Sequence, residues 1–158
     1  MVNFFREAIS REAGELTFLL PLQMEKLDLS LMQGTTLSAV GLITKVNEIL
    51  ASLDLKDGLL AFKAINAKKE AVYPIFETYC RNLAITILNL QTIFDMETFV
   101  LGGGISAQSI LIEEVNRQFD KVHHEIDFIG KIIKRPKIVA CHHNGTNLIG
   151  AAYFLKQG

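Results

Sequence analysis

The sequence has few of the residues that mark secreted, disulfide-bonded or membrane proteins. Its 158 residues include two cysteines, Cys80 and Cys141, three prolines and no tryptophan. Because the cysteines lie far apart and form no C-x-x-C pair, neither a disulfide framework nor a structural zinc site is indicated. No apolar run reaches the roughly 18 residues that a membrane helix needs. We therefore expect a cytoplasmic protein, with no membrane partner and two reduced thiols.

An excess of one charge is also lacking. The chain has 16 Lys and Arg residues against 17 Asp and Glu residues, a formal net charge of −1. This balance gives no electrostatic reason to expect nucleic acid or an anionic membrane as a partner. The densest basic cluster is interpreted as a solvated rim beside a strand. It consists of Lys131, Lys134, Arg135 and Lys137.

What the sequence does have is helical periodicity, strongest in its first half. Asp57 predicts the N-cap of a short helix that runs through Asn66. The longest helix is predicted for residues 72–94, with Pro74 near its start and a turn beginning at Asp95. Before these, an apolar stripe with three- and four-residue spacing predicts another helix. That stripe consists of Leu37, Val40, Ile43, Val46 and Leu50.

Two short buried strands are predicted at residues 97–103 and 136–141, each bounded by glycine or proline. A helix between them would bury Leu111, Val115, Phe119 and Val122 and turn Glu113, Glu114 and Arg117 to the other side. The stretch 123–136 is compatible with a short helix that ends at Gly130. Strands separated by helices predict one α/β domain over residues 1–158, helix-rich with a few mostly parallel strands. Further short strands before residue 23 and a closing helix over 148–157 complete the expectation.

Three consecutive glycines, Gly102, Gly103 and Gly104, stand at the end of the first of these strands, in the stretch "FVLGGGIS". A backbone without Cβ atoms can approach a ligand closely and can take a positive φ. Between a strand and a helix, such a turn favours anions, phosphates above all. The triplet is neither a P-loop nor a G-x-G-x-x-G motif. A tight turn that only allows close helix packing is therefore an equal alternative.

The paired histidines, His123–His124 and His142–His143, do not form a convincing metal site. Adjacent residues point to different sides of a helix or a strand, so neither pair presents two ligands to one ion. Both pairs are interpreted as polar surface or loop residues. His142, Asn144 and Asn147 follow a strand end, where loop capping is favoured over a contact with nucleotide.

The segment "RNLAITILNLQTIFDMETFVLGGGIS" strongly resembles the ROK family (repressor, open reading frame, kinase) of bacterial sugar kinases and regulators. The ending "PKIVACHHNGTNLIGAAYFL" is similar to the family's carboxy-terminal signature, and "AGELTF" looks like the family's "AGEIGH". The resemblance extends from about Val2 to Leu155. It implies the carboxy-terminal part of an actin-like, hexokinase-type fold built from RNase-H-like domains.

By this resemblance, Gly102, Gly103 and Gly104 would line the pocket for ATP, bound with Mg²⁺, and Glu15 would contact a hexose or related sugar. Phe18 stands where many members have a histidine that binds zinc, and the family's cysteine cluster is absent, so no zinc is expected. The family's amino-terminal domain, with its catalytic aspartate and phosphate-binding turns, has no counterpart in these residues. We therefore assign no catalytic residue and expect no phosphoryl transfer by this chain alone.

Two functions remain open. The chain is either the nucleotide-binding part, and part of the sugar-binding site, of a glucokinase-like or fructokinase-like ROK kinase, or a non-catalytic regulatory or dimerisation module derived from the family. The resemblance leaves room for an amino-terminal half as partner. Apolar faces and a sheet edge uncovered by its absence predict self-association, such as a symmetric homodimer.

Overall fold

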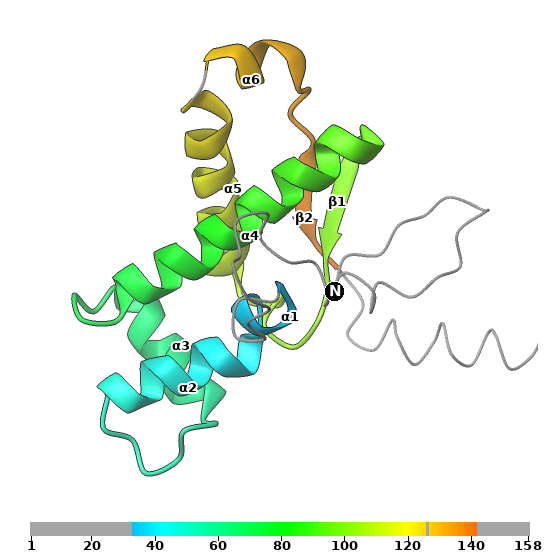
Figure 1. Ribbon diagram of the computed structural model, residues 1–158. Coiled ribbons are helices and arrows are strands. Elements are labelled where there is room, and N and C mark those ends of the chain that lie inside the picture. The colour runs from blue at the N-terminus through cyan, green and yellow to red at the C-terminus, as the bar shows by residue number, and fades with distance from the viewer. Residues whose placement is uncertain (1–32, 126, 142–158) are drawn as a thin grey trace, which may run out of the picture.

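The computed structural model describes residues 33–125 and 127–141. The elements in chain order are α1 (Gln33–Thr36), α2 (Ala39–Ile49), α3 (Gly58–Asn66), α4 (Tyr73–Phe94), β1 (Thr98–Leu101), α5 (Ser109–His124), α6 (Asp127–Ile132) and β2 (Lys137–Ala140). Figure 1 shows a helix-rich α/β arrangement in which the small sheet lies near one end of α4, and α2 and α3 lie near the other. No helix within these residues is both long enough and apolar enough to span a bilayer.

The two described strands are parallel, as the alternation of helices and strands predicts. Phe99 of β1 lies opposite Ile138 of β2, and both side chains are buried. The amide of Cys141 donates to the carbonyl of Leu101 at 2.8 Å, so the pairing continues to the carboxyl ends of both strands. Helix α5 connects the strands together with α6, which places both carboxyl ends at one edge of the sheet.

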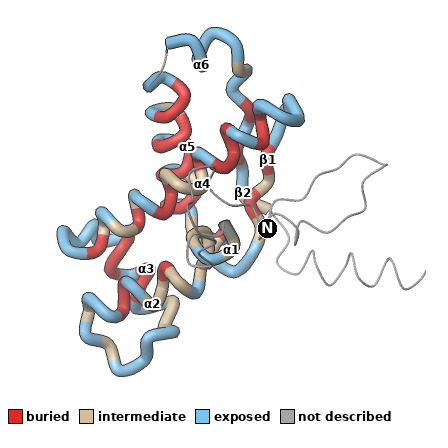
Figure 2. The backbone as a smooth tube through the Cα atoms, viewed as in Figure 1, coloured by how far each residue is buried: buried red, intermediate tan, exposed pale blue. Residues whose placement is uncertain are grey.

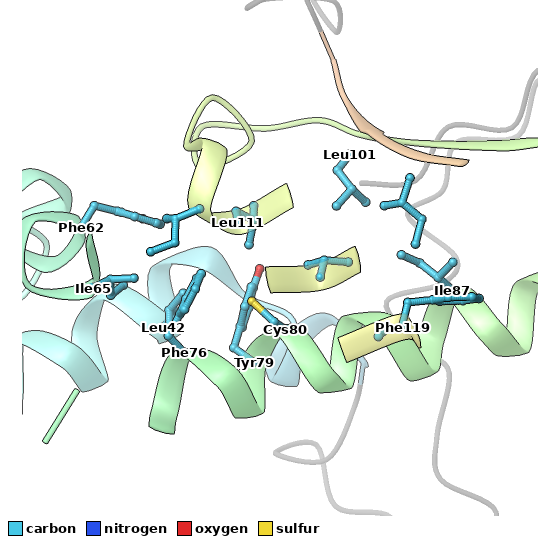
Figure 3. Packing of buried hydrophobic residues seen from close by; sticks show 14 of the residues in the cluster. Leu42, Phe62, Ile65, Phe76, Tyr79, Cys80, Ile87, Leu101, Leu111 and Phe119 are labelled. Carbon is cyan, nitrogen blue, oxygen red and sulfur yellow. The ribbon is translucent and has the colours of Figure 1, made fainter. Parts of the chain in front are cut away.

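The core runs along α4, which packs most extensively against α5 (Figure 3). At the first half of α4, Phe76 meets residues of α2 and α3 such as Leu42 and Phe62. Further along, Ile87 faces the side of α5 that carries Phe119. In Figure 2 the buried segments form a continuous band through the middle of these helices and the strands. The turn regions at their ends stay exposed.

Several local signals act as the sequence predicts. The carboxylate of Asp57 accepts a hydrogen bond of 3.0 Å from the amide of Leu60 and caps α3, which ends at Asn66. Pro74 lies in the first turn of α4, where its missing N–H costs no helical hydrogen bond. Asp95 ends α4 in a left-handed conformation with φ of 44°. These features fix both ends of the helices that carry the core.

Several predicted positions differ from the structure, and β1 ends at Leu101, so Gly102 and Gly103 lie outside the strand predicted over 97–103. Val40 of the predicted apolar stripe is 58% exposed, whereas Val46 of the same stripe is buried. Gly130 does not end α6, which continues to Ile132. A Cβ atom at Gly130 would lie 3.3 Å from the carbonyl oxygen of His123, so glycine here allows α6 to approach the end of α5.

Candidate functional site at the glycine turn

The three predicted glycines follow β1 directly and begin the turn that leads to α5 at Ser109. They therefore lie at the carboxyl ends of the parallel strands, the edge at which open α/β sheets bind ligands. Gly103 has φ of 103°, a conformation that residues with a Cβ atom rarely adopt. Position 103 therefore requires glycine, because a residue with a Cβ atom would be strained at this φ.

The turn is open to solvent. Among residues 33–125 and 127–141, Cβ atoms built on Gly103 or Gly104 would meet no atom within 4 Å, and one on Gly102 would touch the Cβ atom of Cys141 at 4.0 Å. Close helix packing, the alternative left open by the sequence, therefore does not account for glycine at positions 103 and 104. No described residue occupies the space over the backbone of Gly104.

Ser106 holds the turn from beneath and was not singled out from the sequence. Its buried hydroxyl donates to the carbonyl oxygen of Gly103 at 2.8 Å, and its amide donates to the same oxygen at 3.1 Å. With that carbonyl held by Ser106, the amides of Gly104 and Ile105 donate to no backbone oxygen within the part of the chain that the structure describes. In the sequence, the position of Ser106 two residues after the glycine triplet is the feature that indicates this role.

A cavity of about 500 Å³ opens beside the turn, and we call it the strand-end cavity. This volume lies in the range of roughly 300–1,000 Å³ that small-molecule sites occupy. Its lining combines apolar groups with two hydroxyls, a thiol and one carboxylate. The lining residues are Ser106, Ala107, Ser109, Ile112, Glu113, Ala140 and Cys141.

A second cavity of about 530 Å³ lies on the other side of the first turns of α5, and we call it the helix cavity. Most of its lining is polar or charged and comes from the end of α3, the start of α4 and α5. The lining residues are Asn66, Lys68, Tyr73, Glu77, Ser109, Ile110, Glu113, Glu114 and Arg117. Ser109 and Glu113 thus line both cavities.

Glu114 is buried, with 3% of its surface exposed, which contradicts its predicted position on the solvent side of α5. Its carboxylate accepts hydrogen bonds from Tyr73, Arg117 and Gln118 at 2.6–2.9 Å. Burial alone would raise the pKa of Glu114, but these hydrogen bonds and the charge of Arg117 outweigh it and lower the pKa. The glutamate is therefore a charged anchor between α4 and α5.

The hydrogen bonds to Glu114 also shift the pKa values of the titratable residues that donate them. Burial, followed by the hydrogen bond to Glu114, raises the pKa of Tyr73 to about 12. Hydrogen bonds to Glu114 and Glu77 raise the pKa of Arg117 further above its ordinary value. Tyr73 is consequently neutral and Arg117 is charged at physiological pH, and both act as hydrogen-bond donors in the wall of the helix cavity.

His123 is also buried, although it was expected on the surface. Its ring stacks on Phe119 with centroids 5.7 Å apart, and Nε2 lies 2.6 Å from the carbonyl oxygen of Ile133. Since a carbonyl can only accept, Nε2 carries the proton. The chain after α6 folds back over this ring, a contact that the local pattern around His123 does not reveal. His124 is exposed, as expected.

The remaining predicted residues divide in two groups. The basic cluster from Lys131 to Lys137 is exposed, and Arg135 from it pairs with Asp120 at 2.6 Å. Glu15 and Phe18 lie outside the described residues, as do the second histidine pair, Asn144 and Asn147. Across residues 33–125 and 127–141, no three His, Cys, Asp or Glu side chains are placed to hold a metal ion.

The described residues form a helix-rich α/β fold with two parallel strands and an exposed glycine turn at their carboxyl ends. The chain belongs to the ROK family, whose model matches residues 34–158. It is similar to a solved ROK family protein from Streptococcus pneumoniae TIGR4 in complex with sucrose. The two share 26% identity and a TM-score of 0.71, over 92% of this chain and 50% of that one. This chain therefore spans about half the length of that protein. No curated protein sequence matched.

Proposed function

We propose that this chain forms the nucleotide-binding part of a ROK-type sugar kinase, within an actin-like, hexokinase-type fold. The phosphates of ATP, with Mg²⁺, would bind over Gly102, Gly103 and Gly104. The observation that carries the proposal is the open turn, where a Cβ atom on Gly103 or Gly104 would meet nothing within 4 Å in the part of the chain that the structure describes. Such a surface lets a bulky anion reach the backbone.

The donor chemistry fits a phosphate. The carbonyl of Gly103 accepts two bonds from Ser106, and the neighbouring amides of Gly104 and Ile105 have no described backbone acceptor. Successive backbone N–H groups in a turn favour anions. Mg²⁺ would enter with the phosphates, since this ion keeps several waters and few protein ligands in such sites. We assign it no described side chain.

The sugar side of the proposal rests on the resemblance and on the similar pneumococcal protein, which was solved with sucrose. We propose a hexose or related sugar as substrate, contacted by Glu15. Phosphoryl transfer needs a carboxylate positioned to take the hydroxyl proton. We assign that role to no residue of this chain, and we expect the 158-residue polypeptide to bind nucleotide without transferring phosphate.

Calorimetry with Mg-ATP and Mg-ADP tests the nucleotide site, and Gly104→Val is the sharpest variant. The valine fits the unliganded protein but occupies the space over the backbone, so ATP affinity should fall at least about tenfold, a loss of roughly 1.4 kcal/mol. Gly104→Ala should give a smaller loss. Gly58→Ala, at the remote start of α3, provides a glycine control with unchanged affinity. Equal ATP binding by Gly104→Val and the unaltered chain would refute the proposed site.

The alternative function, a non-catalytic regulatory or dimerisation module, is favoured by a different observation. Large apolar side chains are exposed on α4 and α6, with Ile93 70%, Phe128 68% and Ile132 64% accessible. Light scattering after size-exclusion chromatography measures the mass in solution. Nucleotide binding by a monomer supports the kinase proposal, whereas a stable dimer that binds no nucleotide supports the module.

A further inference from the structure

Ser109 and Glu113 are four residues apart on α5 and therefore share one face of the helix. Both residues line the strand-end cavity and the helix cavity. The two cavities therefore lie on either side of these two residues, which form the border between them. A ligand held by its phosphates at the glycine turn would cross Ser109 and Glu113 to extend toward Tyr73.

The helix cavity, unlike the glycine turn, is lined by charged side chains. The helix cavity holds three carboxylates, Glu77, Glu113 and Glu114, against two cations, Lys68 and Arg117. Arg117 is already paired with Glu77 and Glu114. A triphosphate is repelled from such a surface, but an uncharged group rich in hydroxyl donors is not.

Glu113 is the carboxylate best placed to receive that group. Its side chain is exposed, unlike that of Glu114, and no cation pairs with it among residues 33–125 and 127–141. Its acceptor oxygens are thus available at the border between the two cavities. A carboxylate accepts from neighbouring hydroxyls of a ribose, the same chemistry by which an acidic residue reads the ribose in dinucleotide-binding folds.

We propose that Glu113 accepts hydrogen bonds from the 2′- and 3′-hydroxyls of the nucleotide ribose, with the Ser109 hydroxyl beside it. The inference rests on the proposed nucleotide site and adds the orientation of the nucleotide within it. The phosphates lie at Gly104, and the nucleoside lies across the first turns of α5. Glu113 therefore selects ribonucleotides over deoxyribonucleotides.

A binding cycle with two ligands and two proteins tests this selection. Calorimetry measures Mg-ATP and Mg-2′-deoxy-ATP with the unaltered chain and with Glu113→Ala. We expect the unaltered chain to bind ATP about tenfold more tightly than 2′-deoxy-ATP, the effect of one charge-assisted hydrogen bond. Glu113→Ala should bind the two ligands with nearly equal affinity. Glu97→Ala, which removes an exposed carboxylate at the opposite end of β1, should keep the discrimination.

The outcomes separate the two proposals. If the unaltered chain binds neither ligand, the nucleotide site itself is wrong and the role of Glu113 falls with it. If it binds both but Glu113→Ala weakens them by the same factor, the nucleotide site stands and ribose recognition by Glu113 is refuted. Thermal unfolding of each variant verifies that the protein is folded, which the exposed position of Glu113 leads us to expect.

Discussion

The hydroxyl of Tyr73 donates a hydrogen bond of 2.9 Å to Oε2 of Glu114, across 41 positions of sequence. This bond joins the first turn of α4 to α5 beneath the helix cavity. The same carboxylate oxygen accepts from Nε of Arg117 at 2.9 Å. A buried charge is costly unless its lone pairs are occupied, and here they are. Glu114 therefore holds α4 and α5 together at the wall of the helix cavity, which Glu113 also lines.

Replacing Glu114 with alanine should lower the free energy of unfolding by about 3 kcal/mol, the usual cost of breaking a buried charged network. The loss is large because the donors of Tyr73, Arg117 and Gln118 lose their shared acceptor. Urea denaturation followed by circular dichroism measures it. The adjacent Glu113→Ala is the matched control and should change stability by less than about 0.5 kcal/mol. Equal effects of the two substitutions would contradict the assignment of Glu114 as an anchor.

Acid should weaken the protein through the same carboxylate. The pKa of Glu114 in the folded state lies below its ordinary value of 4.5. Its contribution to stability is therefore fully present above pH 4.5 and is lost as the pH falls through the lower, folded-state pKa. Denaturant unfolding at a series of pH values from 7 to 3 should show a decline that is steeper in the unaltered chain than in Glu114→Gln.

Glu125 provides the comparison for this acid effect. The hydrogen bond from Arg81 lowers the pKa of Glu125, but the pair is exposed to solvent. Exposed ion pairs contribute little to stability. Glu125→Gln should therefore keep the acid dependence of the unaltered chain. If stability depended less on pH in Glu125→Gln but not in Glu114→Gln, the acid effect would come from Glu125 and the prediction for Glu114 would be wrong.

The elements of this fold could be predicted because their signals are local. Asp57 caps α3 through an amide three residues away, and Pro74 and Asp95 mark the two ends of α4. The parallel strands follow from the alternation of strand and helix, which permits few other connections. The position of the glycine turn at a strand end follows from the same alternation.

The buried polar residues could not be predicted because their partners are distant in sequence. The sequence places Glu114 on the surface beside Glu113, but its burial depends on hydrogen bonds from Arg117 and Gln118 and on the distant Tyr73 of α4. His123 is covered by the segment around Ile133, which folds back after α6. The shared position of Ser109 and Glu113 between two cavities likewise depends on how α4 and the strands pack against α5. Helical spacing alone predicts which residues share a face of α5, but it does not predict which elements pack against that face.

Alanine should destabilise the protein at Gly103 but not at the neighbouring Gly104. Gly103→Ala places a side chain at φ of 103° and should cost about 1–3 kcal/mol of stability, the usual penalty for such backbone. Gly104 does not share that positive φ, and a Cβ there has free space. Gly104→Ala should be neutral or stabilising by roughly 0.4–1 kcal/mol, since alanine restricts the unfolded chain. Thermal unfolding of both variants makes the comparison, and equal losses would contradict the turn geometry.

The two cysteines should differ in reactivity, and nucleotide should change only one of them. Cys80 is fully buried, and burial raises the pKa of its thiol, so the reactive thiolate is scarce. Cys141 is half-buried and lines the strand-end cavity beside the glycine turn. N-ethylmaleimide followed by mass spectrometry should therefore modify Cys141 first in the folded protein.

Saturating Mg-ATP should slow the modification of Cys141 several-fold, because the ligand would cover the mouth of the strand-end cavity. Cys141→Ser removes the fast site and should leave a protein that reacts only on unfolding, when Cys80 becomes accessible. Gly104→Val should lose the protection by ATP while keeping the basal rate of Cys141. Unchanged modification of Cys141 at an ATP concentration that calorimetry shows to be saturating would mean that the nucleotide binds elsewhere. The strand-end cavity would then have to be assigned to a different ligand.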